Sequence, residues 1–421
     1  MSSKYTIFVK LGSNKDLAKL ELSVLLKKLG VEDVAFTEWM EYILLKLNRN
    51  TFTKFFKILD YTGSIIKAGY LNSEVSIDKE DIWKLKLKDH LVMNIEKFSS
   101  EKNNLLKIAL DVQAKNIELR NRIINYIRTT IKNYSKEVKI QTKIIGMKKT
   151  YSEITPFQFY KENFPKRGLE VISFNVKSKL IFGITKWVTN PLLDIKQDER
   201  RQTRLFTHGT SIKLARTLVF LSEVSNDGLL LDPFCGTGTI LIEALKRKMQ
   251  TIGMDKDPKC FRASKDNLNA FSLQYPARAK MKDKWIVYSQ DSRDLGKILK
   301  EKSLDAIVTE PYLGPFLKQL PSIDEARETM KTLEKLYIRV LREGSNLLKD
   351  TGKIIFILPV YHYSDKLEVH PDIEKIASQC SLVNQESSKF FHVSLPLQIG
   401  RKHNIINRYL AIFTKQLNET R

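Results

Sequence analysis

The pattern of hydrophobic and polar positions changes near residue 200, and the change predicts two different architectures. In the first half, alternation of apolar and polar residues predicts half-buried strands, and apolar residues at helical spacing predict helices. The strands are expected at residues 5–10 and 41–47, and the helices at 16–29, 51–59 and 117–131. This mixture of short elements is typical of small α+β units.

In the second half, apolar runs of strand length alternate with stretches of helical periodicity. The runs lie at residues 229–231, 251–254, 285–288, 304–308 and 354–358. Such alternation predicts a doubly wound, mostly parallel sheet, so the expected fold class of this half is α/β and Rossmann-like. A polar stretch at 190–210, with Pro191 near its start, is the expected linker between the halves.

The net charge of the chain limits the class of binding partner to be expected. The 421 residues include 71 Lys or Arg and 48 Asp or Glu, so the formal net charge is +23. Both halves are basic. A charge of this size favours a polyanionic partner, most simply nucleic acid. A generic lysine-rich surface is the alternative explanation.

Cysteine and histidine usage argues against disulfides and metal. Cys235, Cys260 and Cys380 form no disulfide framework, and neither they nor the six histidines have metal-ligand spacing. No apolar run approaches the roughly 20 residues of a membrane helix, and the N-terminus lacks the apolar core of a signal peptide. We therefore expect a cytoplasmic protein with no metal.

A lysine cluster stands out in the first half. Residues 101–150 are rich in lysine, and five of these side chains flank an apolar pair at 144–145. They are the predicted RNA-binding residues Lys136, Lys139, Lys143, Lys148 and Lys149. Phosphate contact is the functional interpretation of this cluster, and a solvated helix face is the alternative.

The most informative stretch runs from residue 229 to 243. An apolar strand ends at Asp232, a turn with Gly236 and Gly238 follows, and an amphipathic helix begins near residue 239. Glycine permits positive φ and close approach to a ligand. Asp255 ends the next strand, 19 residues after Gly236, which is the spacing of an acid that binds ribose hydroxyls in a βαβ unit.

The loop matches neither of the common phosphate-binding fingerprints. The third glycine of the dinucleotide motif is absent, an acid precedes the loop, and no lysine follows the second glycine. A cationic cofactor suits the acids better. S-adenosylmethionine carries a sulfonium and an ammonium, so Asp232 is expected to meet the ammonium, directly or through water, and Asp291 to accept from the adenine amine. An ordinary strand–turn–helix with acidic caps is the alternative.

All three acids fall at the carboxyl ends of strands, where ligands bind in open α/β sheets. The predicted cofactor-binding residues are Asp232, Pro233, Phe234, Gly236, Thr237, Gly238, Asp255, Lys256, Asp291 and Ser292.

The stretch at residues 232–244, DPFCGTGTILIEA, resembles the first motif of Rossmann-fold RNA methyltransferases that carry a THUMP domain. The similarity is greatest to the tRNA guanosine-10 N2-methyltransferases, a putative RNA methylase family, and next to 23S rRNA guanine N2-methyltransferases. Residues 208–219 resemble the family's helix before the first strand, and residues 11–21 the opening of its ferredoxin-like subdomain.

The resemblance implies a domain order. It implies a ferredoxin-like subdomain at 1–75, a THUMP-like RNA-binding domain at 76–190, a linker at 191–210 and a seven-stranded methyltransferase domain at 211–421.

The fourth expected strand leads into Glu310-Pro311-Tyr312, where amino methyltransferases typically carry Asp/Asn-Pro-Pro-Tyr/Phe. Acceptors that hold the N–H groups of an exocyclic amine raise electron density on its nitrogen and position it for attack on the methyl. Glu310 and the Pro311 carbonyl are the predicted acceptors, and Tyr312 is predicted to stack on the flipped base. One proline is missing and the acid is longer, so the target atom stays open. A proline turn with an incidental acid is the alternative.

Cys235 lies inside the cofactor loop, where packing is its expected role. The basic segment 400–408 precedes an expected strand at 409–413 and is predicted to form a loop near the substrate, with phosphate contact left open.

The leading hypothesis is an S-adenosylmethionine-dependent methyltransferase acting on a guanine exocyclic amine in RNA, most simply tRNA. The alternatives are an rRNA guanine N2-methyltransferase, a DNA amino-methyltransferase and a non-catalytic RNA-binding protein on a methyltransferase scaffold. No helix-turn-helix or similar DNA reader is recognisable in the first half.

The charge yields a test of RNA binding. If several Lys and Arg side chains contact phosphates, the affinity for tRNA falls steeply between low and moderate salt because counterions are released. Filter binding over a salt series measures the slope. A flat series would contradict the predicted partner.

Overall fold

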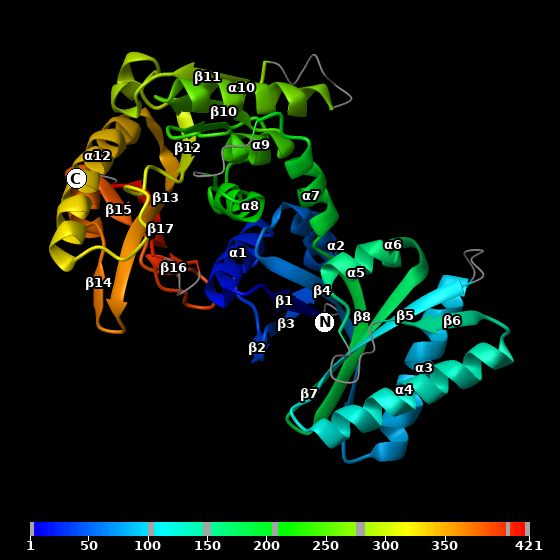
Figure 1. Ribbon diagram of the computed structural model, residues 1–421. Helices are drawn as coiled ribbons and strands as arrows, with labels where there is room; N and C mark the ends of the chain where they lie inside the picture. The colour runs from blue at the N-terminus through cyan, green and yellow to red at the C-terminus, as the bar shows by residue number, and fades with distance from the viewer. Residues whose placement is uncertain are drawn as a thin grey trace. The chain divides into compact units, whose positions relative to one another are not determined.

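A computed structural model describes residues 4–99, 105–145, 153–203, 209–274, 283–400 and 405–416 (Figure 1). Two compact units emerge from its contacts. The first unit comprises Met1–Gly12, Leu29–Asp60 and Ile65–Lys196. The second unit comprises Ser13–Lys28, Tyr61–Ser64 and Gln197–Arg421. An early helix, assigned from the sequence to an N-terminal subdomain, is thus part of the second unit.

The first unit is built on one sheet of eight strands, counted over the described residues. Its order is β2-β3-β1-β4-β8-β7-β5-β6. Neighbours are antiparallel except for β5, which is parallel to both β6 and β7. The strands are β1 (Lys4–Leu11), β2 (Phe36–Trp39), β3 (Tyr42–Asn48), β4 (Ile65–Ser76), β5 (Leu105–Gln113), β6 (Gln141–Ile144), β7 (Gly168–Val176) and β8 (Lys179–Val188).

Two long helices cover one face of this sheet. In α3 (Glu80–Ser99), Trp83, Leu87, Leu91 and Ile95 recur every fourth residue and are fully buried. They pack with apolar residues of α4 (Ile117–Glu137) and with strands β5, β7 and β8 in one core. The shorter helices are α2 (Arg49–Ile58), η1 (Leu59–Tyr61), α5 (Pro156–Lys161) and α6 (Phe164–Arg167).

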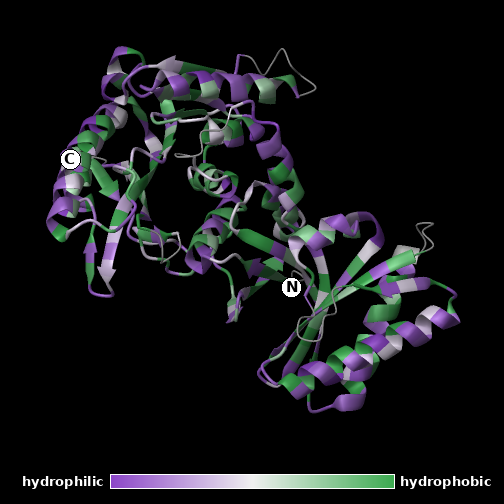
Figure 2. Cartoon of the chain, in the orientation of Figure 1, coloured by the Kyte–Doolittle hydropathy of each residue, from purple (hydrophilic) through white to green (hydrophobic). Residues whose placement is uncertain are grey.

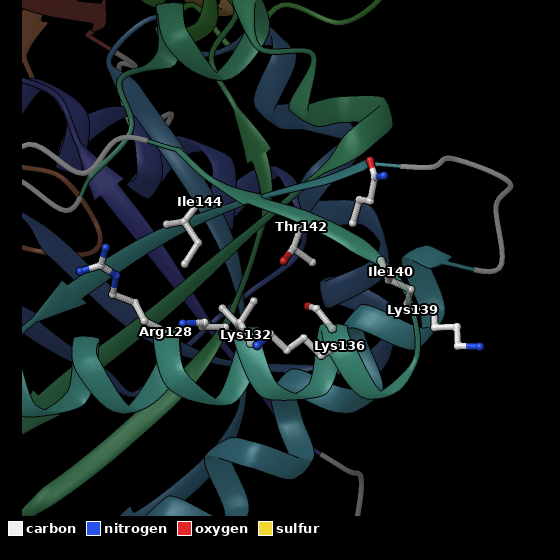
Figure 3. A pocket seen from close by; sticks show the side chains of 10 residues that line it. Arg128, Lys132, Lys136, Lys139, Ile140, Thr142 and Ile144 are labelled. Atoms are coloured by element: carbon white, nitrogen blue, oxygen red, sulfur yellow. The ribbon is translucent and has the colours of Figure 1, made fainter.

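The outward face of α4 remains polar, as its colours show (Figure 2). Together with β6 this face lines an open groove of about 590 Å³ (Figure 3). Two predicted strands and two predicted helices of the first half are present, since β1, β3, α2 and α4 cover all but at most one end residue of the ranges 5–10, 41–47, 51–59 and 117–131.

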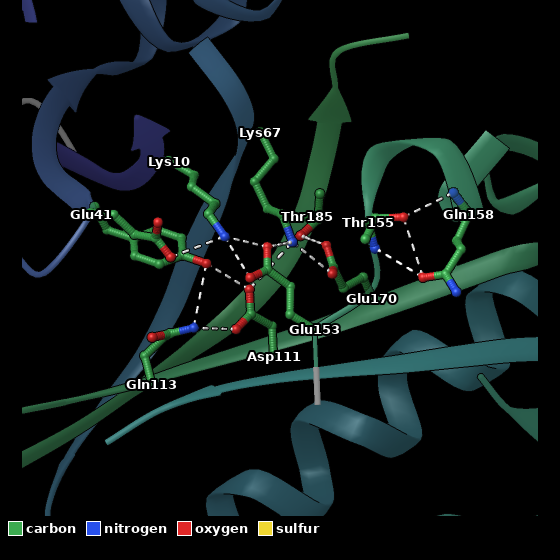
Figure 4. A network of polar contacts seen from close by, with 11 residues as sticks. Lys10, Glu41, Lys67, Asp111, Gln113, Glu153, Thr155, Gln158, Glu170 and Thr185 are labelled. Carbon is green, nitrogen blue, oxygen red and sulfur yellow. Dashed lines mark hydrogen bonds and ion pairs between the residues drawn. The ribbon is translucent and has the colours of Figure 1, made fainter. Parts of the chain in front are cut away.

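A buried charge network ties the strands of the first unit together (Figure 4). Lys67 on β4 is 1% exposed and forms ion pairs with Asp111 at 3.3 Å, Glu170 at 2.8 Å and Glu153 at 2.9 Å. Burial by itself lowers the pKa of Lys67, but the three carboxylates outweigh it and raise this pKa above its usual value. Tyr42 donates to Asp111 at 2.8 Å, so β3, β4, β5 and β7 meet at one buried cation.

In the described residues, the second unit contains one sheet of nine strands, and seven of them form a continuous path, as predicted. Its order is β11-β10-β9-β12-β13-β17-β15, and β14 and β16 add short pairings to β13 and β17. The first five strands in this order are parallel, and β17 is antiparallel to β13 and β15. The α/β Rossmann-like prediction is therefore confirmed.

Six strands of the described residues correspond to predicted apolar runs, whereas the short strands β14, β15 and β16 lie outside those runs. The strands of this sheet are β9 (Leu229–Asp232), β10 (Gln250–Asp255), β11 (Trp285–Ser289), β12 (Leu304–Thr309), β13 (Leu348–Ser364), β14 (Leu367–Val369), β15 (Leu382–Asn384), β16 (Leu397–Ile399) and β17 (Asn407–Lys415). The helices are α8 (Ile212–Leu221), α9 (Thr239–Lys246), α10 (Pro258–Leu273), η2 (Ser292–Lys297), α12 (Ile323–Leu347) and α13 (Ile373–Gln379).

Helix α1 (Lys15–Lys28) belongs to this unit because a buried acid ties it there. Glu21 is fully buried and accepts from the backbone N–H of Gly63 at 2.7 Å and of Ser64 at 2.8 Å. A methyl group on Gly63 would meet the Lys213 carbonyl of α8 at 2.1 Å, so only glycine fits between these segments. Sequence proximity to β1 therefore did not decide the packing of α1.

The predicted linker holds a helix that its polar composition did not reveal. Helix α7 runs from Pro191 to Glu199, with Asn190 accepting from the Leu192 N–H at 3.1 Å. Proline suits the first helical turn because its missing N–H would have no intrahelical partner there. None of the helices in the described ranges is both long and apolar enough to cross a membrane.

The buried cation predicts a stability difference. Lys67→Met leaves buried carboxylates without their partner, so the first unit should lose about 3–5 kcal/mol of unfolding free energy. Urea denaturation followed by tryptophan fluorescence measures it, because Trp39, Trp83 and Trp187 lie in this unit. The matched control is Lys179→Met, which removes an exposed ion pair with Glu74 and should cost about 1 kcal/mol or less. Equal losses in the two variants would contradict the role of the network.

Candidate active site

Four acids converge on the carboxyl edge of the parallel sheet. Asp232 and Asp255 are the last residues of β9 and β10, and Glu310 directly follows β12. Asp291 comes two residues after β11. The register pairs Gly253 with Asp232 and Asp255 with Ser289, so β10 and β11 end together, two residues beyond the end of β9. Because parallel strands all end at one edge, residues far apart in the sequence form one site.

The glycine loop between β9 and α9 has the strained backbone that the sequence predicted. Gly236 and Gly238 have φ of +52° and +81°. A methyl group on Gly238 would lie 2.8 Å from the Ser264 hydroxyl, so a side chain is excluded there. The loop is held on β10, because the Cys235 N–H donates to the Met254 carbonyl at 2.8 Å. The backbone therefore approaches the ligand side without a side chain in the way.

Asp232 is the most unusual group of the site. It is 1% exposed, accepts from the Thr309 hydroxyl at 2.6 Å and accepts from the Phe234 N–H at 3.1 Å. Burial raises the pKa of Asp232 to about 7, and the nearby carboxylates of Asp255 and Glu310 act in the same direction. No Lys or Arg in the described part of the chain forms an ion pair with it. A buried acid with this pKa suits a cationic ligand.

The other predicted cofactor acids differ in their surroundings. Asp255 accepts from the Gly236 N–H at 3.0 Å and the Asp257 N–H at 2.9 Å, and burial raises its pKa. Asp291 caps η2 and pairs with Arg293 at 2.7 Å, and this hydrogen bond lowers its pKa. Both oxygens of Asp291 are thus engaged by Arg293.

The remaining predicted residues of the cofactor loop have packing or surface positions. Pro233, Thr237 and Ser292 are buried, Phe234 is half-buried against the core, and Lys256 is exposed. Cys235 packs with the α9 and α10 core, and burial raises the pKa of its thiol well above its usual value. A nucleophilic role for Cys235 does not fit this environment.

Glu310 is held by two residues that sequence reasoning did not assign to the site. Thr210, which precedes α8, donates its hydroxyl to Oε2 at 2.6 Å. Arg408 of β17 donates Nε to Oε1 at 2.5 Å. The sequence placed Arg408 in a segment expected near the substrate, but its contact with Glu310 depends on the pairing of β17 with β13.

The loop after Glu310 presents aromatic side chains on an anchored backbone. Tyr312 is 48% exposed and Phe316 is 78% exposed, whereas Pro311 is buried. The Tyr337 hydroxyl donates to the Tyr312 carbonyl at 2.6 Å. Further along the loop, the Tyr363 hydroxyl donates to the Pro321 carbonyl at 2.7 Å. Exposed aromatic faces at fixed positions are suited to stacking on a base.

The predicted lysine cluster lies in the first unit, but its residues do not all line the same groove. Lys136 and Lys139 line the groove between α4 and β6, together with Arg128 and Lys132 (Figure 3). Within the described residues, no carboxylate forms an ion pair with these four side chains. Lys143 does not line the groove and is opposite Lys107 in the β5–β6 pairing. Lys148 and Lys149 lie outside the described residues.

Two family models match the chain. One, described as an RMKL-like methyltransferase domain, matches residues 201–378 and therefore spans both the glycine loop and Glu310. The other, described as a DNA methylase, matches residues 36–266 and ends before Glu310. Both models describe methyl transfer. The chain belongs to the S-adenosylmethionine-dependent methyltransferases.

Two relatives of this methyltransferase come from archaea. It is 32% identical over 185 residues to a tRNA (guanine(10)-N2)-dimethyltransferase of Methanothermobacter thermautotrophicus, covering 44% of this chain and 46% of the relative. It is 25% identical over 295 residues to the enzyme of the same description in Methanocaldococcus jannaschii, covering 63% of this chain and 76% of the relative. The match thus spans about half of the first relative. The predicted resemblance to this family is confirmed.

A solved structure with the same fold is TrmN from Thermus thermophilus. The likeness covers 98% of this chain and 100% of TrmN, with 12% identity and a TM-score of 0.52. At this identity the likeness concerns the fold.

The residues of the site fit S-adenosylmethionine. Asp232 is a buried acid without a protein cation in the described ranges, and the glycine bend leaves the adjoining backbone open to a ligand. Asp232 would hold the ammonium group, and Asp255 would hold the ribose hydroxyls.

The pKa of Asp232 predicts a pH dependence of cofactor binding. With a pKa of about 7, the ionised fraction falls about fivefold between pH 7 and pH 6, and the affinity should fall by the same factor. Calorimetric titration with S-adenosylmethionine measures it. Asp232→Ala should abolish binding. Asp232→Asn keeps the shape but not the charge, so its residual binding should show no such decline. An equal decline in Asp232→Asn would contradict the assignment.

Proposed function

We propose that this methyltransferase transfers methyl groups from S-adenosylmethionine to the N2 amine of a guanosine in tRNA. The observation that carries the proposal is the hydrogen bond from Thr309 to Asp232 at 2.6 Å. It joins the residue directly before Glu310 to the acid of the cofactor loop. The cofactor end and the amine-accepting end of the site are therefore neighbours.

When bound, S-adenosylmethionine would supply an electrophilic methyl group on a sulfonium, whose sulfur is the leaving group. The amine would form the C–N bond and release a proton to solvent. The chain's part is to present the amine. Glu310 and the Pro311 carbonyl accept its two N–H groups, which holds the nitrogen lone pair away from the ring. Tyr312 stacks on the extruded base.

RNA is favoured over DNA as the substrate. Both archaeal relatives carry names that specify tRNA and guanine N2. The DNA methylase model ends at residue 266, before the segment that would hold the amine. The basic groove supports contact with a phosphate backbone, because Arg128, Lys132 and Lys136 recur every fourth residue along one face of α4. The names of these two relatives also favour tRNA over rRNA as the substrate.

The first unit would supply RNA recognition. We infer a ferredoxin-like subdomain at residues 1–75, although its helix α1 and Tyr61–Ser64 are part of the second unit, and a THUMP-like domain at 76–190, which contains α3, α4 and the groove. Folded RNA is recognised largely by shape and backbone, which suits a basic groove better than a set of base-reading side chains.

A non-catalytic scaffold is the second candidate, because Glu310 replaces the usual shorter acid. The pairing of Glu310 with Arg408 and Thr210 argues against it. A side chain without a role at the strand edge would not need two donors from separate elements. The uncompensated Asp232 argues in the same direction, since a scaffold gains nothing from a buried acid kept ready for a cation.

Mass spectrometry of nucleosides tests the proposal. Unmodified tRNA transcripts are incubated with the protein and S-adenosylmethionine, then digested. We expect N2-methylguanosine or its dimethyl form. Glu310→Ala should bind the cofactor like the wild type, because Glu310 lies outside the loop, yet lose product by about 100-fold or more.

Three outcomes would contradict the proposal. They are methylation of an adenine amine, methylation of DNA but not tRNA, and no product from a wild type that binds the cofactor. Equal loss of cofactor binding and turnover in Glu310→Ala would show that Glu310 acts in cofactor binding instead.

A further inference from the structure

Arg408 is the one strong cation beside the proposed amine acceptor in the described residues. It is the second residue of β17 and lies opposite Pro359 on β13 in the antiparallel register. From there its Nε reaches Glu310 Oε1 at 2.5 Å. The side chain of Glu310 is 9% exposed, and that of Arg408 is 32% exposed. The guanidinium is therefore more accessible to a ligand than the acid that it pairs with.

Arg408 has more N–H groups than its hydrogen bond to Glu310 requires. A guanidinium has five N–H groups in a fixed plane, and Nε serves the carboxylate. Among the described residues, Glu310 is the one hydrogen-bonding partner of this side chain. The terminal nitrogens remain available to a ligand bound next to Glu310.

Glu310 likewise has acceptor positions that its two protein donors do not occupy. A carboxylate offers about four acceptor positions, two on each oxygen. Arg408 takes one on Oε1 and Thr210 takes one on Oε2. One position on each oxygen is left, so the acid can accept two neighbouring N–H groups at once.

This arrangement has the order of groups that the Watson–Crick edge of guanine requires. That edge presents two adjacent donors, N2–H and N1–H, followed by the O6 acceptor. Adenine presents its amine beside the N1 acceptor, which would face a carboxylate with its lone pair. Arginine is the usual donor to the O6 of guanine. An acid with two free acceptor positions beside a guanidinium thus matches guanine and rejects adenine.

We propose that Arg408 is the specificity residue of this site and donates a hydrogen bond to O6 of the guanine whose amine Glu310 accepts. The proposal rests on the function proposed above and deepens it. It assigns the choice of guanine to a residue of β17 that lies outside the Glu-Pro-Tyr segment.

A thermodynamic cycle that combines one substitution in the enzyme with one substitution in the substrate base tests the assignment of Arg408. The enzyme change is Arg408→Met, which removes every donor but keeps the apolar length of the side chain. The substrate is a tRNA transcript with 6-thioguanosine at the position that the wild type methylates. This base keeps N1–H and N2–H but replaces O6 with sulfur, a weaker acceptor. The values of kcat/KM for both transcripts are measured with both enzymes.

We expect the wild type to prefer guanosine over 6-thioguanosine by about tenfold, and Arg408→Met to lose this preference to within about twofold. On guanosine, Arg408→Met should lose about 10- to 100-fold in kcat/KM. Its affinity for S-adenosylmethionine should not change, since in the described residues the polar contact of Arg408 is with Glu310 and not with the glycine loop. Arg339→Met, at an exposed arginine of α12, is the matched control and should behave like the wild type.

Arg408→Lys keeps the charge and serves as the second variant if Arg408→Met does not fold. Because it lacks the planar fork, it should also reduce the preference for guanosine. An equal loss on both transcripts with the preference intact would overturn the proposal, because Arg408 would then act only through Glu310. If the wild type forms no N2-methylguanosine, the proposed function fails and this assignment fails with it. The two failures are distinguishable by the presence of product.

Discussion

The second unit depends on a carboxyl group that folding removes from water without giving it a protein cation among the described residues. Asp232 ends β9 beneath the glycine loop, and burial raises its pKa to about 7. A buried carboxylate becomes stable when a cation joins it. The Thr309 hydroxyl holds the acid from the next strand, so the group that would receive the cofactor is tied to the strand that carries Glu310.

The Glu-Pro-Tyr segment departs from the usual pattern in a way that the fold accommodates. A longer acid reaches farther and has more rotamers, so it needs more support to hold one position. Thr210 and Arg408 provide that support from the segment before α8 and from β17. The same two contacts leave one acceptor position on each oxygen. Under the proposed assignment, the altered motif and its added partners would form one base-recognition site.

The first unit combines a buried, paired lysine with a groove lined by basic side chains. Its strands meet at the buried Lys67, whose carboxylate partners lie on different segments of the chain. On the outside, Arg128, Lys132 and Lys136 line the groove without protein counterions in the described ranges. The buried Lys67 thus has carboxylate partners, whereas the basic side chains of the groove have none among the described residues and are suited to contact with phosphate.

The sequence by itself determined the class of fold and most of the cofactor loop, because both are local. Apolar runs predict the strands of the parallel sheet, and Gly236 and Gly238 mark a turn with positive φ, which glycine adopts most readily. Only the tertiary structure decided that α1 joins the second unit and that Arg408 contacts Glu310. Those outcomes depend on packing and strand pairing between segments distant in sequence, and no local pattern of residues encodes such pairings.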